Sequence, residues 1–298
     1  ERTVGYYIPM MVGANIAYAR SISELGEDLQ TIKPTLMISV PRIYERVYNK
    51  IQAGLAEKSP LATKLFNLAV DTGWKRFLHR QGRGSWHPVF LLWPLLNKLV
   101  AGKIMAKLGG NMHMAASGGA PLPMPIARVF IGLGLNLIQG YGLTETSPIL
   151  TANPEKDNEP GSVGIPLRGI ELRVADDDEL LARGPVIMLG YWNNQEATDA
   201  VIDAEGWFHT GDKARIENNH VYITGRLKEI IVMANGEKVP PADMEMAIAL
   251  DTLFEQVMII GDNRPYLTAM IVLNEEQWAI HAKNLELDSS DPDAPAAE

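Results

Sequence analysis

Residues 139–148, Gln-Gly-Tyr-Gly-Leu-Thr-Glu-Thr-Ser-Pro, follow directly on Leu135 to Gln139, an apolar run with the length of a buried strand. A similar run, Met112 to Ala116, precedes it, and the residues between, from about Pro123 to Ile131, have the pattern of a helix. Strand, helix and strand in this order predict an α/β fold, in which ligands bind beyond the carboxyl ends of the strands. The quoted stretch lies at such an end.

The residue types in 139–148 favour ligand binding over packing. The stretch places an aromatic ring, two glycines, several hydroxyls and one carboxylate within a few positions. An aromatic ring can stack on a base, a Thr hydroxyl can hold a phosphate oxygen and a carboxylate can hold Mg²⁺. Core packing gives no reason for so many polar groups, so we interpret the stretch as a nucleotide-binding loop.

Three further polar stretches occur at expected turns: Ser117-Gly-Gly-Ala-Pro-Leu122, Gly206-Trp-Phe-His-Thr-Gly-Asp212, and Gly225-Arg-Leu-Lys-Glu229 with the following Asn235-Gly-Glu-Lys238. The glycines of the first let a flat ring approach the backbone closely, although a simple strand-to-helix turn explains it better when it is taken alone. The carboxylate ending the second could accept both hydroxyls of a ribose. The third suggests a charged hinge, or equally a solvated pair of charges.

The first half of the chain is expected to contain a strand at 36–40, a helix with apolar positions from Ile43 to Leu55, and a helix that Ser59 caps and Pro60 begins. Beyond Pro160 we expect short strands at 170–174 and 180–183, and a hairpin, 213–223, turning at Asn218-Asn219. A small α+β region is expected from 229, with strands at 230–233, 256–260 and 267–273 and helices at 242–250 and 276–283. The acidic, Pro- and Ala-rich tail, 288–298, is expected to be disordered.

Composition sets limits on function. The 298 residues carry a net charge of −9, which argues against nucleic acid as a partner, since neutralising phosphates needs a basic face. With no cysteine, the chain has no disulfide, thiolate nucleophile or cysteine metal site. We expect a cytoplasmic protein of about two domains. The chain begins at Glu1 without a signal peptide, and we interpret it as an internal piece of a longer protein.

The order of the polar stretches, joined by Arg183-Gly-Pro-Val-Ile-Met-Leu-Gly-Tyr-Trp192, resembles the adenylate-forming superfamily, which includes acyl-CoA synthetases, luciferases and nonribosomal adenylation domains. Glu237-Lys-Val-Pro-Pro241 and Arg264-Pro-Tyr-Leu-Thr-Ala269 make it most similar to bacterial long-chain fatty acyl-CoA synthetases. The resemblance implies part of a large AMP-binding domain at 1–225, with an α/β subdomain (1–160) and a β-rich subdomain (161–225). A hinge at 226–228 and part of a small α+β lid domain at 229–298 would follow.

The same resemblance implies roles for single residues. Glu145 would hold Mg²⁺, Thr144 would contact the α-phosphate, and Lys228 would be the hinge residue. The ATP or AMP site would be formed by Gly119, Ala120, Pro121, Gly140, Tyr141, Gly142, Thr144, Asp212, Ile223 and Arg226. Of these, Gly119 to Pro121 would line the adenine pocket, Tyr141 would pack on the adenine, and Asp212 and Arg226 would bind the ribose. Gly236 would border the CoA channel.

The implied reaction converts a fatty acid, ATP and CoA into acyl-CoA, AMP and pyrophosphate through an acyl-adenylate, with ATP, Mg²⁺ and CoA as its cofactors and cosubstrates. Two alternatives stay open: an acyl-AMP ligase that passes the acyl group to a carrier protein, and a non-catalytic adenylate-binding module. The family's phosphate loop would precede residue 1 and its late lysine would follow residue 298. The chain alone is therefore expected to be inactive.

Residues 74–107 combine basic and aromatic side chains, then an apolar run from Val89 to Val100. One interpretation is peripheral contact with an anionic membrane at the inner face, where a fatty acid would be collected. The other, which the composition favours, is a surface helix followed by a core helix.

Overall fold

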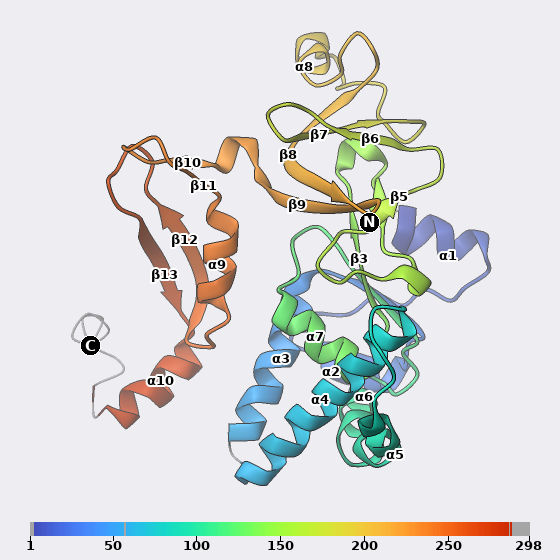
Figure 1. Cartoon of the computed structure of the whole chain (residues 1–298), viewed down its shortest axis with the longest axis vertical. Coiled ribbons are helices and arrows are strands. Elements are labelled where there is room, and N and C mark those ends of the chain that lie inside the picture. The colour runs from blue at the N-terminus through green and yellow to red at the C-terminus, as the bar shows by residue number, and fades with distance from the viewer. Residues whose placement is uncertain (1–2, 57, 286, 288–298) are drawn as a thin grey trace. The chain divides into compact units, whose positions relative to one another are not determined.

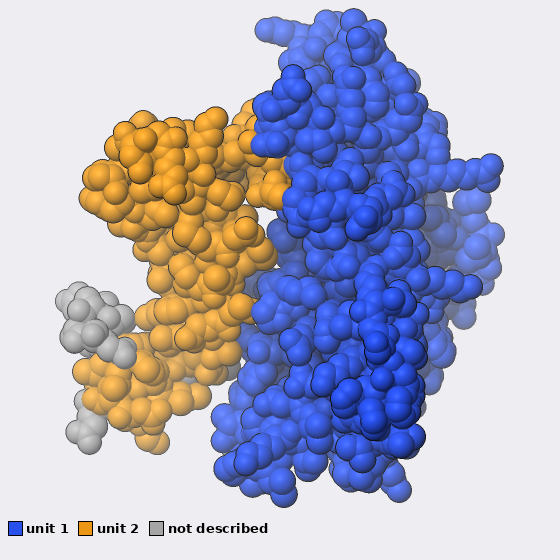
Figure 2. Space-filling view, viewed as in Figure 1, with its two compact units in different colours: residues 1–210, 214–223 blue, residues 211–213, 224–298 orange. Residues whose placement is uncertain are grey.

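The computed structural model describes residues 3–56, 58–285 and 287, and these form two compact units (Figures 1 and 2). Unit 1 comprises residues 1–210 and 214–223, and unit 2 comprises 211–213 and 224–298. The chain thus passes into unit 2 at Thr224, beside the expected hinge. The acidic tail predicted to be disordered, 288–298, lies outside the described residues.

Unit 1 is built on a sheet with strand order β1-β2-β3-β4-β5. Its first three strands, β1 (Leu36–Ser39), β2 (Met114–Ser117) and β3 (Leu137–Tyr141), are parallel. The short strands β4 (Thr151–Ala152) and β5 (Ile165–Pro166) extend it in antiparallel fashion. The strand–helix–strand prediction is confirmed, with α7 (Met124–Gly132) between β2 and β3.

The helices of unit 1 pack into a core beside this sheet. In α3 (Pro41–Ala56) and α4 (Pro60–Arg80), the apolar side chains Ile51, Leu55, Phe66 and Val70 join one cluster with residues of α7 and of the helical run after Pro88. Pro60 occupies the first turn of α4 as expected, but Ser59 makes no capping hydrogen bond through its side chain. Further short helical segments of unit 1 include η1 (Thr3–Tyr7), α1 (Ile8–Met11), α2 (Leu25–Ile32), η4 (Thr144–Thr146), η5 (Glu155–Asp157) and α8 (Gln195–Asp199).

A second sheet, order β6-β7-β8-β9, forms the β-rich part. It contains β6 (Glu171–Val174), β7 (Glu179–Arg183), β8 (Phe208–Glu217) and β9 (His220–Arg226). The predicted hairpin turn is present: Asn218 and Asn219 have φ values of 48° and 68°, a left-handed conformation that asparagine adopts more readily than most residues.

Unit 2 contains the expected α+β elements. These are η6 (Leu227–Glu229), β10 (Ile231–Val232), β11 (Lys238–Val239), α9 (Pro241–Ala249), β12 (Phe254–Ile260), β13 (Thr268–Leu273) and α10 (Glu275–Asn284). The pairs β10–β11 and β12–β13 are both antiparallel. Trp278 and Ala282 of α10 form a small buried cluster with Leu253, Leu273 and Leu287.

The apolar run Val89 to Val100 is helical, but the expectation of a core helix is wrong. It belongs to a helical stretch of four consecutive segments, η2 (Pro88–Leu92), α5 (Trp93–Leu96), η3 (Asn97–Ala101) and α6 (Gly102–Lys107). Only 11% of the most apolar 18-residue part of this stretch is buried. Hydropathy alone did not reveal that one apolar face packs while another remains at the surface.

Candidate nucleotide-binding site

Two of the predicted loops lie at the same edge of the parallel sheet. Ser117, the last residue of β2, pairs with Gln139 of β3. The segment Gly118 to Pro121 therefore leaves the sheet beside the segment that begins at Gly140. The structure thus brings together the loops that were predicted separately to contact a nucleotide.

Glycines allow close backbone approaches in these loops. A Cβ on Gly142 would lie 1.8 Å from the carbonyl oxygen of Pro148, and one on Gly140 would lie 3.1 Å from that of Thr151. Gly119 has φ of +84°, which a side chain would strain. Gly119, Ala120 and Pro121 are exposed, so this part of the loop is accessible to a ligand.

The turn after Gly142 is held by a buried hydroxyl. Oγ1 of Thr146 accepts a hydrogen bond from the backbone N–H of Leu143 at 2.9 Å, and lies within hydrogen-bond distance of the carbonyl oxygens of Leu143 (3.0 Å) and Pro148 (3.1 Å). Thr146 is fully buried, whereas Thr144 is exposed. The turn therefore uses one threonine for structure and leaves the hydroxyl of the other available to a ligand.

Glu145 points to a second segment of unit 1. Its Oε1 accepts a hydrogen bond from the Tyr191 hydroxyl at 3.0 Å, and its carbonyl oxygen accepts one from the Met188 N–H at 2.7 Å. Burial, and then the hydrogen bond to the Glu145 carboxylate, raise the pKa of Tyr191. The tyrosine consequently remains a hydrogen-bond donor around neutral pH.

The carboxylate of Glu145 fits a metal site in which a bound nucleotide supplies the other ligands. In the part of the chain that the structure describes, no group of three or more His, Cys, Asp or Glu side chains could hold an ion on its own. Mg²⁺ is often bound through one or two carboxylates together with substrate phosphates. Glu145 suits that arrangement, in which it would supply one ligand and a bound nucleotide others.

Tyr141 and Ile223, two of the residues predicted to contact adenosine, pack against one hydrophobic cluster. Its buried members are Leu180, Ala214 and Val221. Tyr141 also packs against a second cluster built around Leu150. The parallel sheet and the β-rich sheet thus meet at the ring of Tyr141, which fixes its position at the end of β3.

The remaining predicted residues belong to unit 2. Asp212 is 5% exposed, and its Oδ1 accepts a hydrogen bond from Nε of Arg226 at 2.9 Å. Lys228 is exposed in η6, two residues beyond Arg226. Gly236 lies at the exposed turn between β10 and β11 with φ of +84°. The structure therefore pairs Asp212 with Arg226, as two residues expected to share one ligand.

Comparison with known proteins decides the family. A family model described as AMP-binding enzyme matches residues 1–192. The chain belongs to this family. A model described as AMP-binding enzyme C-terminal domain matches residues 228–291. The resemblance to adenylate-forming enzymes and the predicted fold class are thereby confirmed.

Relatives of this AMP-binding enzyme include long-chain-fatty-acid–CoA ligase FadD15 of Mycobacterium bovis, 38% identical over 270 residues that cover 88% of this chain and 44% of the relative. The chloroplastic long-chain-fatty-acid–[acyl-carrier-protein] ligase AEE15 of Arabidopsis thaliana is 30% identical, covering 93% of this chain and 44% of that protein. The chain thus spans less than half the length of these relatives. The structure of ATP-bound MatB from Rhodopseudomonas palustris shares the fold, with a TM-score of 0.63 and 22% identity over 96% of this chain and 51% of that one.

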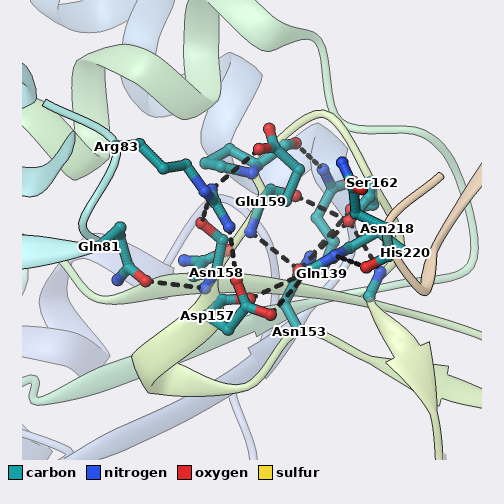
Figure 3. Close-up of polar contacts among 12 residues, drawn as sticks. Gln81, Arg83, Gln139, Asn153, Asp157, Asn158, Glu159, Ser162, Asn218 and His220 are labelled. Atoms are coloured by element: carbon teal, nitrogen blue, oxygen red, sulfur yellow. Dashed lines mark hydrogen bonds and ion pairs between the residues drawn. The ribbon is translucent and has the colours of Figure 1, made fainter.

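A polar network, partly buried, lies behind the sheet edge where the loops after β2 and β3 begin, and it was not predicted from the sequence (Figure 3). Gln139 bridges two segments: its Oε1 accepts from the Leu122 N–H at 3.2 Å, and its Nε2 donates to the Pro160 carbonyl at 2.6 Å. Asn158 donates through Nδ2 to the Leu137 carbonyl at 2.9 Å. These bonds tie β3 and the first loop to the segment after β4.

Arg83 and His220 also belong to this network. Arg83 forms ion pairs with Asp157 (2.7 Å) and Glu159 (2.8 Å), and donates to the Asn158 carbonyl at 2.8 Å. Nε2 of the buried His220 lies 3.1 Å from the Asp157 carbonyl oxygen. Arg83, which was predicted to be part of a basic surface segment, therefore stabilises the fold through these contacts. Because Arg83 lies far from these partners along the chain, no local sequence pattern could have predicted the contacts.

Proposed function

We propose that this chain forms the adenosine-recognising part of an AMP-forming long-chain fatty acid–CoA ligase. The observation that carries the proposal is the pairing of the loops after β2 and β3 at one sheet edge, in a chain that resembles a protein named long-chain-fatty-acid–CoA ligase over most of its length. Ligands of open α/β sheets bind at such an edge.

Each loop has a part in nucleotide binding under this proposal. The exposed segment Gly119 to Pro121 and the ring of Tyr141 would hold the adenine. The exposed hydroxyl of Thr144 would contact the α-phosphate, and Glu145 would hold Mg²⁺, whose charge offsets that of the phosphates. Asp212 and Arg226, in unit 2, would bind the ribose hydroxyls.

The chemistry needs no nucleophilic side chain. A carboxylate oxygen of the fatty acid attacks the α-phosphorus of ATP, a new P–O bond forms, and the bond to the bridging oxygen breaks as pyrophosphate leaves. The CoA thiolate then attacks the acyl carbonyl, a C–S bond forms, and AMP leaves with the electrons of the broken C–O bond. Residues such as Thr144 act by positioning the phosphate, which lowers the barrier by orientation.

The experiment is a chain-length series with the full-length protein. Because each methylene removed from water contributes about 0.8 kcal/mol, kcat/KM for pyrophosphate release should rise steeply from about six to about fourteen carbons. A flat profile, or a maximum with acetate or an aromatic acid, would reject the long-chain substrate and leave the family assignment unaffected.

A second function is favoured by one comparison. AEE15, whose name specifies acyl-carrier-protein as the acceptor, resembles this chain over nearly its whole length. Supplying the full-length protein with palmitate, ATP and either CoA or a phosphopantetheinylated carrier protein separates the two functions. Turnover with CoA alone supports the first, and turnover with the carrier protein alone supports the second.

A further inference from the structure

The helical stretch Pro88–Lys107 has two apolar faces, and only one of them is packed. Trp93, Val100 and Ile104 contact the core cluster that includes Phe66 and Val70 of α4. Figure 1 shows this stretch, which includes α5 and α6, beside α4 in unit 1. The stretch is therefore attached to the domain along its length by that face.

The second face carries leucines at the surface. Leu91, Leu92, Leu95 and Leu99 are 74%, 46%, 56% and 42% exposed, and the nearby Trp86 is 57% exposed. Leu92, Leu95 and Leu99 are separated by three and four positions, which places them along one side of a helix. Scattered exposed leucines are common, but a continuous row marks an interaction surface. We call Trp86, Leu91, Leu92, Leu95 and Leu99 the leucine face.

The charged residues that precede and form this helical stretch are all basic, although the whole chain is acidic. Residues 72–144 contain no Asp or Glu, and positions 72–107 hold Lys75, Arg76, Arg80, Arg83, Lys98, Lys103 and Lys107. Arg83 among them is paired with Asp157 and Glu159. Lys98, Lys103 and Lys107 are exposed, and across the described ranges none of the three has an ion-pair partner within 4.0 Å. Cations beside a row of leucines and an exposed tryptophan are the composition of a helix that lies on an anionic bilayer.

The geometry points to contact with the surface of the bilayer and not to a span. Among the described residues, Pro88–Lys107 is a helical stretch long and apolar enough to cross a membrane. Its opposite face is packed on the domain, however, and the stretch carries the exposed cations Lys98 and Lys103. We propose that the leucine face docks on an anionic phospholipid membrane, with the leucines and Trp86 entering the headgroup boundary and the three lysines facing lipid phosphates. This proposal does not depend on the acyl substrate proposed above.

The test is co-sedimentation of the full-length protein with vesicles. Phosphatidylcholine vesicles containing about a third phosphatidylglycerol should bind the protein, pure phosphatidylcholine vesicles should bind it weakly, and added salt should release it. Replacing Lys98, Lys103 and Lys107 by Gln should lower the partition coefficient on the order of a hundredfold, since each lysine contributes about fivefold. The matched control replaces Lys50, Lys58 and Lys64, which are also exposed, by Gln and should bind like wild type.

Further variants test how much the apolar side chains contribute to vesicle binding. Replacing Leu91, Leu95 and Leu99 by Ser should reduce binding at least about tenfold, whereas Leu61→Ser, at an exposed leucine at the other end of α4, should not. Brominated lipid should quench fluorescence in wild type, and the quenching should shrink in Trp86→Phe.

Two results would overturn the proposal. One is equal vesicle binding by wild type and the lysine triple variant, a comparison that holds even if the leucine variant fails to fold. The other is absence of quenching at Trp86, which would mean that another part of the full-length protein, or a second copy, covers this face.

Discussion

The hydroxyl of Tyr191 donates a hydrogen bond to Oε1 of Glu145 at 3.0 Å, although 46 residues separate the two along the chain. The backbone N–H of Met188 holds the Glu145 carbonyl from the same segment. Glu145 is therefore fixed at both ends by residues 188–191. A carboxylate that shares a metal with a bound nucleotide benefits from such orientation, because a ligand held in place loses less conformational freedom on binding.

We predict that Tyr191→Phe weakens magnesium-dependent nucleotide binding in the full-length enzyme without unfolding it. Loss of one hydrogen bond to a charged group should raise the KM for Mg-ATP about tenfold. A magnesium titration of pyrophosphate release measures the effect, and thermal unfolding should be unchanged.

Two further variants show whether an effect of Tyr191→Phe comes from its hydrogen bond to Glu145. Tyr266→Phe, at an exposed tyrosine of unit 2, controls for loss of a surface hydroxyl. Glu145→Gln should lose far more activity than Tyr191→Phe, because it would remove the proposed metal ligand itself. If Tyr191→Phe and Tyr266→Phe behave alike, Tyr191 does not position Glu145.

Gly142→Ala should destabilise the domain by about 3 kcal/mol, the upper end of the usual cost of overpacking, because the new atom meets backbone. The new Cβ would meet the Pro148 carbonyl oxygen at 1.8 Å and the Ile149 Cα at 2.8 Å, and neither atom belongs to a side chain that could rotate away. Urea unfolding measures the loss.

The control for this prediction is Gly54→Ala. Gly54 lies in α3, and a Cβ there would meet nothing within 4 Å. Alanine in a helix is more stable than glycine by about 0.5–1 kcal/mol, so this variant should gain stability. A Gly142→Ala protein as stable as wild type would show that the loop can rearrange.

Local patterns were sufficient to predict most of the fold. The apolar runs that became β2 and β3 are bounded by glycines and polar residues, and Asn218-Asn219 specifies its turn by the conformations that asparagine tolerates. These features depend on neighbouring residues only. The predicted loops at the ends of β2 and β3 met at one edge because parallel strands place their carboxyl ends together.

Contacts across the sequence were not predictable in the same way. No periodicity indicates that Tyr191 meets Glu145, or that Arg83 leaves the basic segment to pair with Asp157. The exposure of Leu95 was missed for a related reason, since hydropathy measures how apolar a segment is and not which of its faces packs. Gln139 was assigned to the loop by its neighbours, and its buried amide became visible only in three dimensions.

Gln139→Leu should reduce stability by about 2–4 kcal/mol, because it leaves the buried N–H of Leu122 and the buried carbonyl of Pro160 without partners. The same change should weaken AMP binding, since the loop after β2 loses its attachment to β3. Calorimetry with AMP and urea unfolding provide the two measurements. Gln30→Leu, at an exposed site in α2, serves as the control and should alter neither. Unchanged AMP affinity in a destabilised Gln139→Leu protein would limit the role of Gln139 to folding.

Lys228→Pro should separate the two half-reactions that we propose for the full-length protein. Lys228 lies in η6, four residues after the chain enters unit 2 at Thr224, and its side chain is exposed. Proline fixes φ near −65° and so opposes a backbone rotation at this position. We expect acyl-adenylate formation to stay within about twofold of wild type, and transfer to CoA to fall about tenfold or more, as for other hinge changes that hinder a conformational step.

Single-turnover assays of adenylate formation and thioester formation measure the two steps separately. Lys228→Ala removes the same side chain but leaves the backbone free, so it should retain transfer if rotation is what matters. Equal losses in both steps for Lys228→Pro, or a transfer defect of the same size in Lys228→Ala, would assign Lys228 to binding or catalysis and not to a hinge.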